Sequence, residues 1–216
     1  MIKGVIFDLD GTLIDSMRSW ENADHRFLQK FNISPPPGIS EKMKTLSMRE
    51  AADYFISLGI DMDPCDITEY IEKNVSEEYS TTIALKPFVR ELLDVLDAKQ
   101  IPYCVATANY RNLTDTVLKR CGIYDRFSFI YTCAESGIKK DNPEFFPQVA
   151  ALLGTSPEET IVVDDSLHCI TAAACGGFRT VAVYEETSAS QWDTIQKTAE
   201  FSYTDLSGLM QMMENL

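Results

Sequence analysis

The chain has 216 residues, of which 45% are hydrophobic, and it carries a formal net charge of -14 at pH 7. This length suits one substantial core with a smaller insert, and the hydrophobic fraction is ordinary for a globular protein. The acidic excess argues against nucleic acids and anionic membranes as partners, because both bind basic surfaces. No membrane-length apolar run and no signal-peptide pattern appears in the sequence.

The cysteine pattern indicates a reduced protein. None of the six cysteines forms a Cys-x-x-Cys pair, and only two histidines are present to complete a zinc site. Cys104 and Cys121 fall in apolar stretches, where cysteine serves as a small core residue. We therefore expect a cytoplasmic protein. As a separate expectation, it is a monomer or a weak homodimer.

The first apolar run, at residues 4–7, predicts a buried strand of a parallel sheet. It ends in Asp8, Asp10 and Gly11. Ligands of open α/β sheets bind beyond the carboxyl ends of strands, and residues two apart point to the same side. The two carboxylates repel each other, so a divalent cation that prefers oxygen is their simplest partner. The alternative is that Asp10 and Gly11 form only a turn.

Residues 16–81 show helical periodicity throughout and no strand pattern. The expected boundaries are a helix cap at Asp15 or Ser16, a break at the prolines 35–37, a capping box at 47–50 and an Asp-Pro helix start at 63–64. The first of these helices carries Trp20 on its apolar stripe. We therefore expect an all-helical cap domain at 16–81, inserted into a core domain made of 1–15 and 82–216.

From residue 85 the pattern alternates between strands and helices. The expected strands are 103–107, 127–131, 160–164 and 180–183, and the expected helices begin at Pro87, after residue 107, at Asn142-Pro143 and after residue 165. Such alternation forms a parallel sheet covered on both faces. The sequence therefore predicts an α/β fold with a Rossmann-like parallel sheet core and an inserted all-helical cap domain.

The segment Phe7-Asp8-Leu9-Asp10-Gly11-Thr12-Leu13-Ile14-Asp15-Ser16 closely resembles the first motif of the haloacid dehalogenase-like hydrolase superfamily. More narrowly, it resembles the phosphoglycolate phosphatase and β-phosphoglucomutase branch. The resemblance implies an aspartyl-phosphate mechanism assisted by Mg²⁺, with Asp8 as the nucleophile and Asp10 as the general acid/base. A cation-bound carboxylate stays ionised and can attack phosphorus. A second carboxyl can protonate the leaving oxygen and later deprotonate the attacking water.

A second polar group, Thr107-Ala108-Asn109, ends the strand at 103–107. A hydroxyl and successive backbone N–H groups at a strand-to-helix junction can bind a phosphoryl group. Thr and Asn also cap helices, so helix capping is the alternative for these residues. Their place in the order of motifs favours phosphate binding.

The family pattern also places a lysine three residues before a proline that opens a helix, and Lys140 has that spacing from Pro143. By this resemblance Lys140 binds the substrate phosphate and neutralises the nucleophile and the transferring phosphoryl group. Lys139 is adjacent and is expected to be a solvated neighbour. Asp141 departs from the small residue or proline that relatives often carry at this place.

The last motif, Val162-Val163-Asp164-Asp165-Ser166, resembles the acidic metal motif of the family. Two carboxylates at the end of an apolar strand need a cation or hydrogen-bond donors to offset their burial. We expect Mg²⁺ to be held by Asp8, by the backbone carbonyl of Asp10 and by Asp165, while Asp164 ligates it directly or through water.

Together these motifs predict a magnesium-dependent phosphatase that acts on a small phosphorylated metabolite. The first alternative is a β-phosphoglucomutase-like phosphomutase, but such relatives carry a histidine where this chain has Trp20, and an indole cannot relay a proton. A dehalogenase has no use for an acid/base at Asp10. A catalytically silent module that binds phosphate esters has no need for a nucleophile at Asp8 beside that acid.

Overall fold

The computed structural model describes the backbone of residues 1–216 and every side chain except those of Glu41 and Lys44. Six strands form one parallel sheet in the order β3-β2-β1-β4-β5-β6. The strands are β1 (Gly4–Phe7), β2 (Tyr103–Thr107), β3 (Ile130–Thr132), β4 (Thr160–Asp164), β5 (Arg179–Val183) and β6 (Phe201–Tyr203). The strand that carries the first motif therefore lies in the middle of the sheet.

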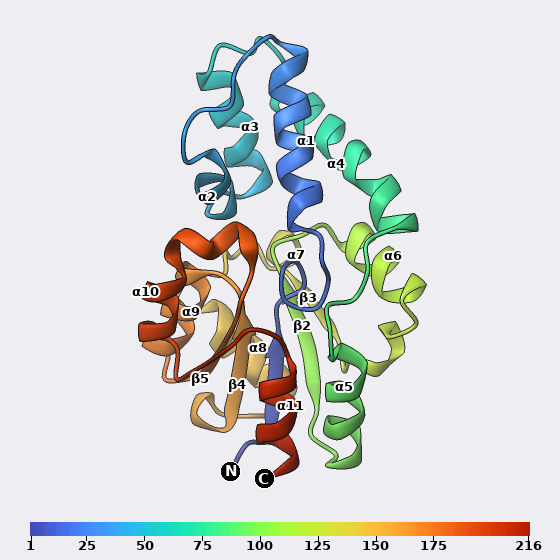
Figure 1. The fold of residues 1–216 in the computed structure, drawn as a ribbon, viewed down its shortest axis with the longest axis vertical. Helices are drawn as coiled ribbons and strands as arrows, with labels where there is room; N and C mark the ends of the chain where they lie inside the picture. Colours follow the sequence, from blue (N-terminus) through green and yellow to red (C-terminus); the bar gives the residue numbers. More distant parts are fainter.

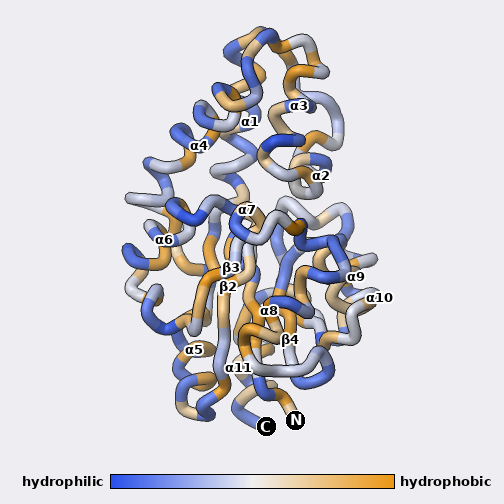
Figure 2. Tube along the Cα trace, turned by 180° about the vertical axis from the view of Figure 1, so that it is seen from behind, coloured by the Kyte–Doolittle hydropathy of each residue, from blue (hydrophilic) through white to orange (hydrophobic). Residues whose placement is uncertain are grey.

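The helices that cover the sheet are α5 (Val89–Ala98), α6 (Arg111–Arg120), α7 (Cys133–Ser136), α8 (Phe145–Leu153), α9 (Leu167–Cys175), α10 (Trp192–Thr198) and α11 (Ser207–Glu214). Val5 and Phe7 of β1 pack in one cluster with side chains of α5, α6 and α11, whereas Ile6 packs in another with α8 and α9. Helices thus cover both faces of the sheet, as predicted. Hydrophobic colouring is frequent along the strands, whereas the helices alternate between hydrophilic and hydrophobic residues (Figure 2).

Four further helices, α1 (Met17–Lys30), α2 (Ile39–Lys44), α3 (Met48–Ser57) and α4 (Pro64–Thr81), follow β1 directly and are called the helical segment below. They gather above one end of the sheet, opposite the end where both chain termini lie (Figure 1). Their interior is aromatic, with the Phe27 ring 5.1 Å from that of Phe55 and 5.3 Å from that of Tyr70. The α/β core with an inserted helical segment is the predicted fold, while the exact division at 15/16 and 81/82 stays a prediction.

Several predicted helix boundaries are confirmed. The Ser47 hydroxyl accepts from Glu50 N–H while the Glu50 carboxylate accepts from Ser47 N–H, which is a complete capping box. Asp63 caps the α4 N-terminus by accepting from Cys65 N–H at 2.8 Å. Ser16 is the N-cap residue of α1, as predicted, but its side chain accepts no hydrogen bond from a helix N–H. The Ser16 hydroxyl instead donates to Asp10, as described below.

Two other expectations differ from the structure. The regular part of β3 is shorter than the predicted strand 127–131, because a 3₁₀ turn at Tyr124–Arg126 precedes it and only the last residues align with β2. The chain beyond residue 183 carries α10, β6 and α11, none of which was predicted. Among the described residues, no helix combines the length and apolarity that crossing a membrane requires.

Candidate active site

The carboxyl ends of β1, β2 and β4 lie side by side beneath the helical segment. The polar residues that follow these strands therefore lie close together. Phe7 pairs with Val105 on one side and with Val163 on the other. Asp8, the next residue, donates its N–H to the Val163 carbonyl at 2.9 Å, which sets it level with Asp164. The sheet register therefore brings the first and last sequence motifs together.

Lys140 joins these two motifs by an ion pair on each side. Its ammonium donates to Asp8 Oδ1 and to Asp164 Oδ2, both at 2.6 Å, and its side chain is only 6% exposed. Although burial lowers the pKa of Lys140, the two carboxylates outweigh burial and raise it, so the group stays charged. Lys139 is half-exposed and pairs with Glu50 of α3 at 2.5 Å. The two adjacent lysines therefore have different surroundings, and only Lys140 reaches Asp8.

Asp8, Asp164 and Asp165 form a cluster of buried carboxylates. Each offers one oxygen, and these oxygens lie within 4.8 Å of one another. Burial raises the pKa of Asp8 well above its ordinary value against the opposing Lys140 ammonium, and the other two carboxylates raise it further. In Asp164 the ammonium and the Ser166 donors outweigh burial and lower the pKa. An oxygen-liganded divalent cation fits this donor set, because it would offset the remaining negative charge.

Gly11 allows the first motif to pass close to this cluster. Its φ of +86° lies in the left-handed region, and a Cβ at this place would stand 3.0 Å from Asp165 Oδ2. A side chain at residue 11 would therefore be strained and would also press on a candidate metal ligand. Asp10 and Gly11 thus do form a turn, and this turn brings the chain against Asp165 of the carboxylate cluster.

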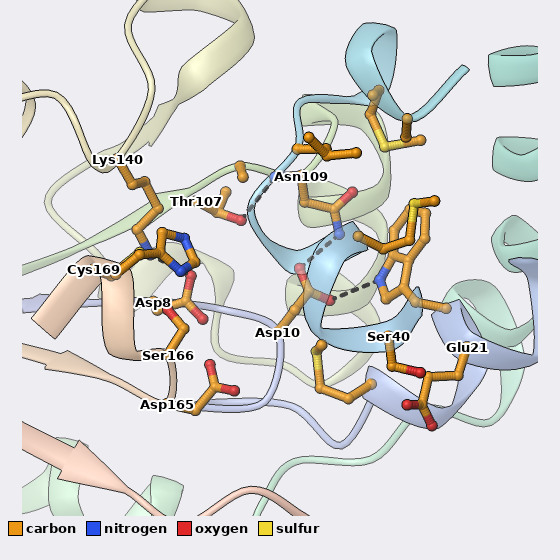
Figure 3. A pocket seen from close by; sticks show the side chains of 18 of the residues that line it. Asp8, Asp10, Glu21, Ser40, Thr107, Asn109, Lys140, Asp165, Ser166 and Cys169 are labelled. Atoms are coloured by element: carbon orange, nitrogen blue, oxygen red, sulfur yellow. Dashed lines mark hydrogen bonds and ion pairs between the residues drawn. The ribbon is translucent and has the colours of Figure 1, made fainter. Parts of the chain in front are cut away.

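Asp10 has partners different from those of Asp8, although both follow the same strand. Its Oδ2 accepts from Asn109 Nδ2 at 2.8 Å, and its Oδ1 accepts from Ser16 Oγ at 2.6 Å. Oδ1 also accepts from the Tyr79 hydroxyl and, at 3.4 Å, from Trp20 Nε1. Figure 3 shows Asp10 between the Asp8–Lys140 end of the site and the helical segment. The Asp10 side chain is not part of the carboxylate cluster, and metal binding by its backbone carbonyl stays a prediction.

The predicted phosphate-binding residues form a tight turn after β2. Thr107 Oγ1 accepts from Asn109 N–H at 3.0 Å, and Asn109 Oδ1 accepts from Tyr110 N–H at 2.7 Å. The Asn109 side chain thus binds the backbone just before α6 through its oxygen and Asp10 through its nitrogen. Thr107, Ala108 and Asn109 all line the same cavity as Lys140, so a phosphoryl group at Asp8 would lie beside them.

This cavity has a volume of about 170 Å³, which is below the roughly 300–1,000 Å³ of sites for drug-sized ligands. Its lower wall comes from the sheet ends already described. Its upper wall comes from the helical segment: Met17, Trp20, Glu21, Asp24, Ser40, Met43, Leu46, Met48, Ala51 and Ile71. The cavity therefore suits a small ligand that has one end against polar core groups and the other against a largely apolar, partly acidic wall.

Asp24 in the upper wall predicts a pH dependence of stability. Burial, with Glu21 nearby, raises its pKa from 3.8 to about 7. The unfolded chain releases this proton at lower pH than the folded chain, so the free energy of unfolding falls as pH rises from about 4 to about 7. We expect Asp24→Asn, which cannot ionise, to raise Tm relative to wild type by more at pH 8 than at pH 5.

Thermal unfolding at both pH values checks this expectation, with the exposed Asp61→Asn as the matched control. A Tm difference for Asp24→Asn that is the same at pH 5 and pH 8 would show that the folded protein does not hold this proton.

Sequence reasoning missed three residues of the site. Ser166 holds Asp164 through its N–H at 3.0 Å and its Oγ at 2.6 Å, and Ser16 and Tyr79 bind Asp10. Ser166 lies two residues after Asp164 in the acidic motif, and this short spacing was a signal for their contact. Tyr79 lies four residues after Val75 on the apolar stripe of α4, which signals burial of its ring but not the partner of its hydroxyl.

The family model for haloacid dehalogenase-like hydrolases matches residues 5–183, and the chain therefore belongs to this family of hydrolases. The family resemblance expected from the first motif is confirmed.

Individual relatives narrow the range of activities within this family. The chain is 26% identical over 182 residues to the pyrophosphatase PpaX of Oceanobacillus iheyensis, covering 84% of this chain and 83% of that protein. It is 26% identical over 223 residues to the phosphoglycolate phosphatase of Chromobacterium violaceum, covering 99% and 97%. Its fold matches a crystal structure of β-phosphoglucomutase from Clostridium difficile with a TM-score of 0.82 at 23% identity, covering 100% and 98%. The chain is thus an enzyme of this hydrolase family, and its relatives in sequence include phosphatases.

Proposed function

We propose that the protein is a magnesium-dependent phosphatase that hydrolyses a small phosphorylated metabolite through an aspartyl-phosphate on Asp8. The observation that carries this proposal is the placement of Lys140 at 2.6 Å from both Asp8 and Asp164, beside the carboxylate cluster and in one cavity with Asp10. That arrangement offers a nucleophile, a fixed positive charge and a separate acid/base around one small space.

In the first step an Asp8 carboxylate oxygen attacks phosphorus, and the bond from phosphorus to the ester oxygen breaks. Asp10 in its protonated form gives its proton to that oxygen, which leaves as an alcohol. In the second step water attacks the phosphorus of the acyl phosphate, Asp10 takes a proton from this water, and Asp8 is released with inorganic phosphate. Lys140 keeps its proton and neutralises charge on the phosphoryl oxygens throughout.

Mg²⁺ fits the carboxylate cluster, since its donors are oxygens of Asp8, Asp164 and Asp165. When bound, the ion supplies positive charge for the phosphoryl oxygens. The chain's own residues then fix that position: Ser166 orients Asp164 by two hydrogen bonds, and Ser188 Oγ donates to Asp165 Oδ2 at 3.3 Å. We assign Thr107, Ala108, Asn109 and Lys140 to the phosphate of the substrate, because they line the cavity next to Asp8.

A phosphomutase is the second candidate, because a solved mutase shares the fold. A mutase must keep water from an aspartyl-phosphate until a second hydroxyl of the sugar attacks. Trp20 lines the cavity and donates its N–H to Tyr79 at 2.8 Å, so the indole offers no acceptor for a proton relay. Water is then the ordinary acceptor of the phosphoryl group, which favours the phosphatase.

Phosphorus NMR separates the two activities. The enzyme is given β-glucose 1-phosphate, Mg²⁺ and a catalytic amount of the glucose bisphosphate, in parallel with a panel of other phosphorylated metabolites. We expect free phosphate from at least one panel member, and either free phosphate or no reaction from the glucose ester. Efficient conversion to glucose 6-phosphate would overturn the phosphatase in favour of the mutase.

The compartment and the assembly are further parts of the proposal. All six cysteines are free thiols, and Cys104 and Cys121 are buried as predicted, which suits a reducing compartment such as the cytoplasm. The small cavity is complete within one chain, so a monomer suffices for the proposed reaction, and a weak homodimer is compatible with it.

A further inference from the structure

Tyr79 is a fully buried residue in the last turns of α4, and its hydroxyl lies against Asp10. A phenol in this position needs hydrogen-bond partners, because an unpaired polar group in the interior is costly. Its hydroxyl is hydrogen-bonded to Asp10 Oδ1, to Trp20 Nε1 at 2.8 Å and to Asn109 Nδ2 at 2.8 Å. Neither step of the proposed reaction uses this residue directly.

The partners of the phenol determine the direction of its own proton. An indole N–H is only a donor, so Trp20 must donate to the Tyr79 oxygen. The Asn109 amide is oriented by Tyr110 N–H, which donates to Oδ1 and leaves Nδ2 to donate to the phenol. These two donors occupy the lone pairs of the phenolic oxygen. Its single proton is therefore donated to Asp10 Oδ1.

The phenol is also held firmly by the fold. The Tyr79 carbonyl accepts from Arg120 Nε of α6 at 2.9 Å, and its ring packs edge-on against Trp20 with centroids 6.1 Å apart. Burial, with the Asp10 carboxylate in contact, raises the pKa of Tyr79 well above its ordinary value, so its proton stays on the phenol. Tyr79 is thus a fixed donor placed by the helical segment and the core together.

We propose that Tyr79 is a positioning residue for Asp10: its donated hydrogen bond orients the carboxyl group that gives a proton to the leaving-group oxygen. This inference rests on the proposed function. Tyr79 does not line the cavity, so it acts on the reaction only through the side chains that its hydroxyl contacts, and Asp10 is the one that accepts its proton. Its proton is not consumed in either step of the reaction.

The inference predicts a dependence on the leaving group. An alkoxide leaves poorly unless it is protonated, so an alkyl ester needs a well-placed acid, whereas 4-nitrophenolate leaves without one. The matched substrates are 4-nitrobenzyl phosphate and 4-nitrophenyl phosphate, which have similar shapes. Their kcat/KM values report the transfer to Asp8 alone, because that transfer completes before water attacks.

We expect Tyr79→Phe, which removes only the hydroxyl, to lower kcat/KM for the benzyl ester by about 10²-fold, the order expected for a misplaced catalytic group. For the nitrophenyl ester the loss should stay within about 3-fold, since no proton from Asp10 is needed there. Asp10→Asn should show the same split with a larger benzyl loss. Tyr103→Phe is the matched control, because its hydroxyl binds the Asp97 carboxylate at 2.7 Å outside the site.

Equal losses on both esters, or no loss on either, would overturn the positioning role. Thermal unfolding first establishes that Tyr79→Phe is folded. If it is not, Trp20→Phe takes its place, because it removes a donor that orients the same phenol and should give the same split in smaller measure. A wild-type enzyme that hydrolyses neither ester would contradict the proposed function itself, whereas an active wild type with uniform losses would contradict only the role of Tyr79.

Discussion

Asp8→Asn is expected to abolish turnover while the protein stays folded. An amide cannot attack phosphorus to form the acyl phosphate, so the first step has no nucleophile. The shape of the buried side chain is unchanged, and Lys140 keeps its ion pair with Asp164 at 2.6 Å, so no buried charge is left without a partner. Steady-state assays of the purified variant, with circular dichroism as the check on folding, measure this effect.

The matched control is Asp15→Asn. Asp15 belongs to the same motif but is exposed and does not line the cavity, so this variant should keep its turnover. Wild-type turnover in folded Asp8→Asn protein would refute the assignment of the nucleophile.

Removal of magnesium is the second change with a large expected effect. Carboxylate oxygens of Asp8, Asp164 and Asp165 lie within 4.8 Å of one another, so the site carries more negative charge than Lys140 offsets, and a phosphate ester adds further negative charge. Without a divalent cation these groups repel the substrate. We expect hydrolysis of 4-nitrophenyl phosphate to vanish in excess chelator and to return when Mg²⁺ is restored.

The carboxylate cluster supplies the control for this experiment. Asp165→Asn keeps the side-chain volume but removes one anionic ligand, so it should raise the Mg²⁺ concentration needed for half-maximal rate. Full activity of the wild-type enzyme in excess chelator would contradict the metal site.

Much of the fold could be predicted because its signals are local. The strands at 103–107 and 160–164 are apolar runs that end in polar residues, and both have the predicted bounds in the structure. The capping box at 47–50 and the Asp63 cap are likewise contacts between near neighbours in the sequence. The parallel order of strands then follows from the alternation with helices, and it brings the separate motifs to one edge of the sheet.

The rest of the site depends on contacts that no short pattern contains. Tyr79 lies 69 residues from Asp10 along the chain, and the helical periodicity of α4 predicts only that its ring is buried. Ser16 stands at the N-cap of α1, as its place in the sequence predicts, but no short pattern shows that its hydroxyl donates to the Asp10 carboxylate. Lys139 and Lys140 are the same residue type in adjacent positions, and only the folded loop turns one toward Asp8 and the other toward Glu50.

Covalent trapping of the phosphorylated enzyme tests the central claim most directly. Borohydride reduces an acyl phosphate to an alcohol, so an aspartyl-phosphate at residue 8 becomes homoserine, which peptide mass spectrometry locates. The proposed reaction predicts homoserine at position 8 when the enzyme is quenched during turnover with substrate and Mg²⁺, and none in Asp8→Asn. Turnover with no reduced residue, or with reduction at another carboxylate such as Asp10, would contradict it.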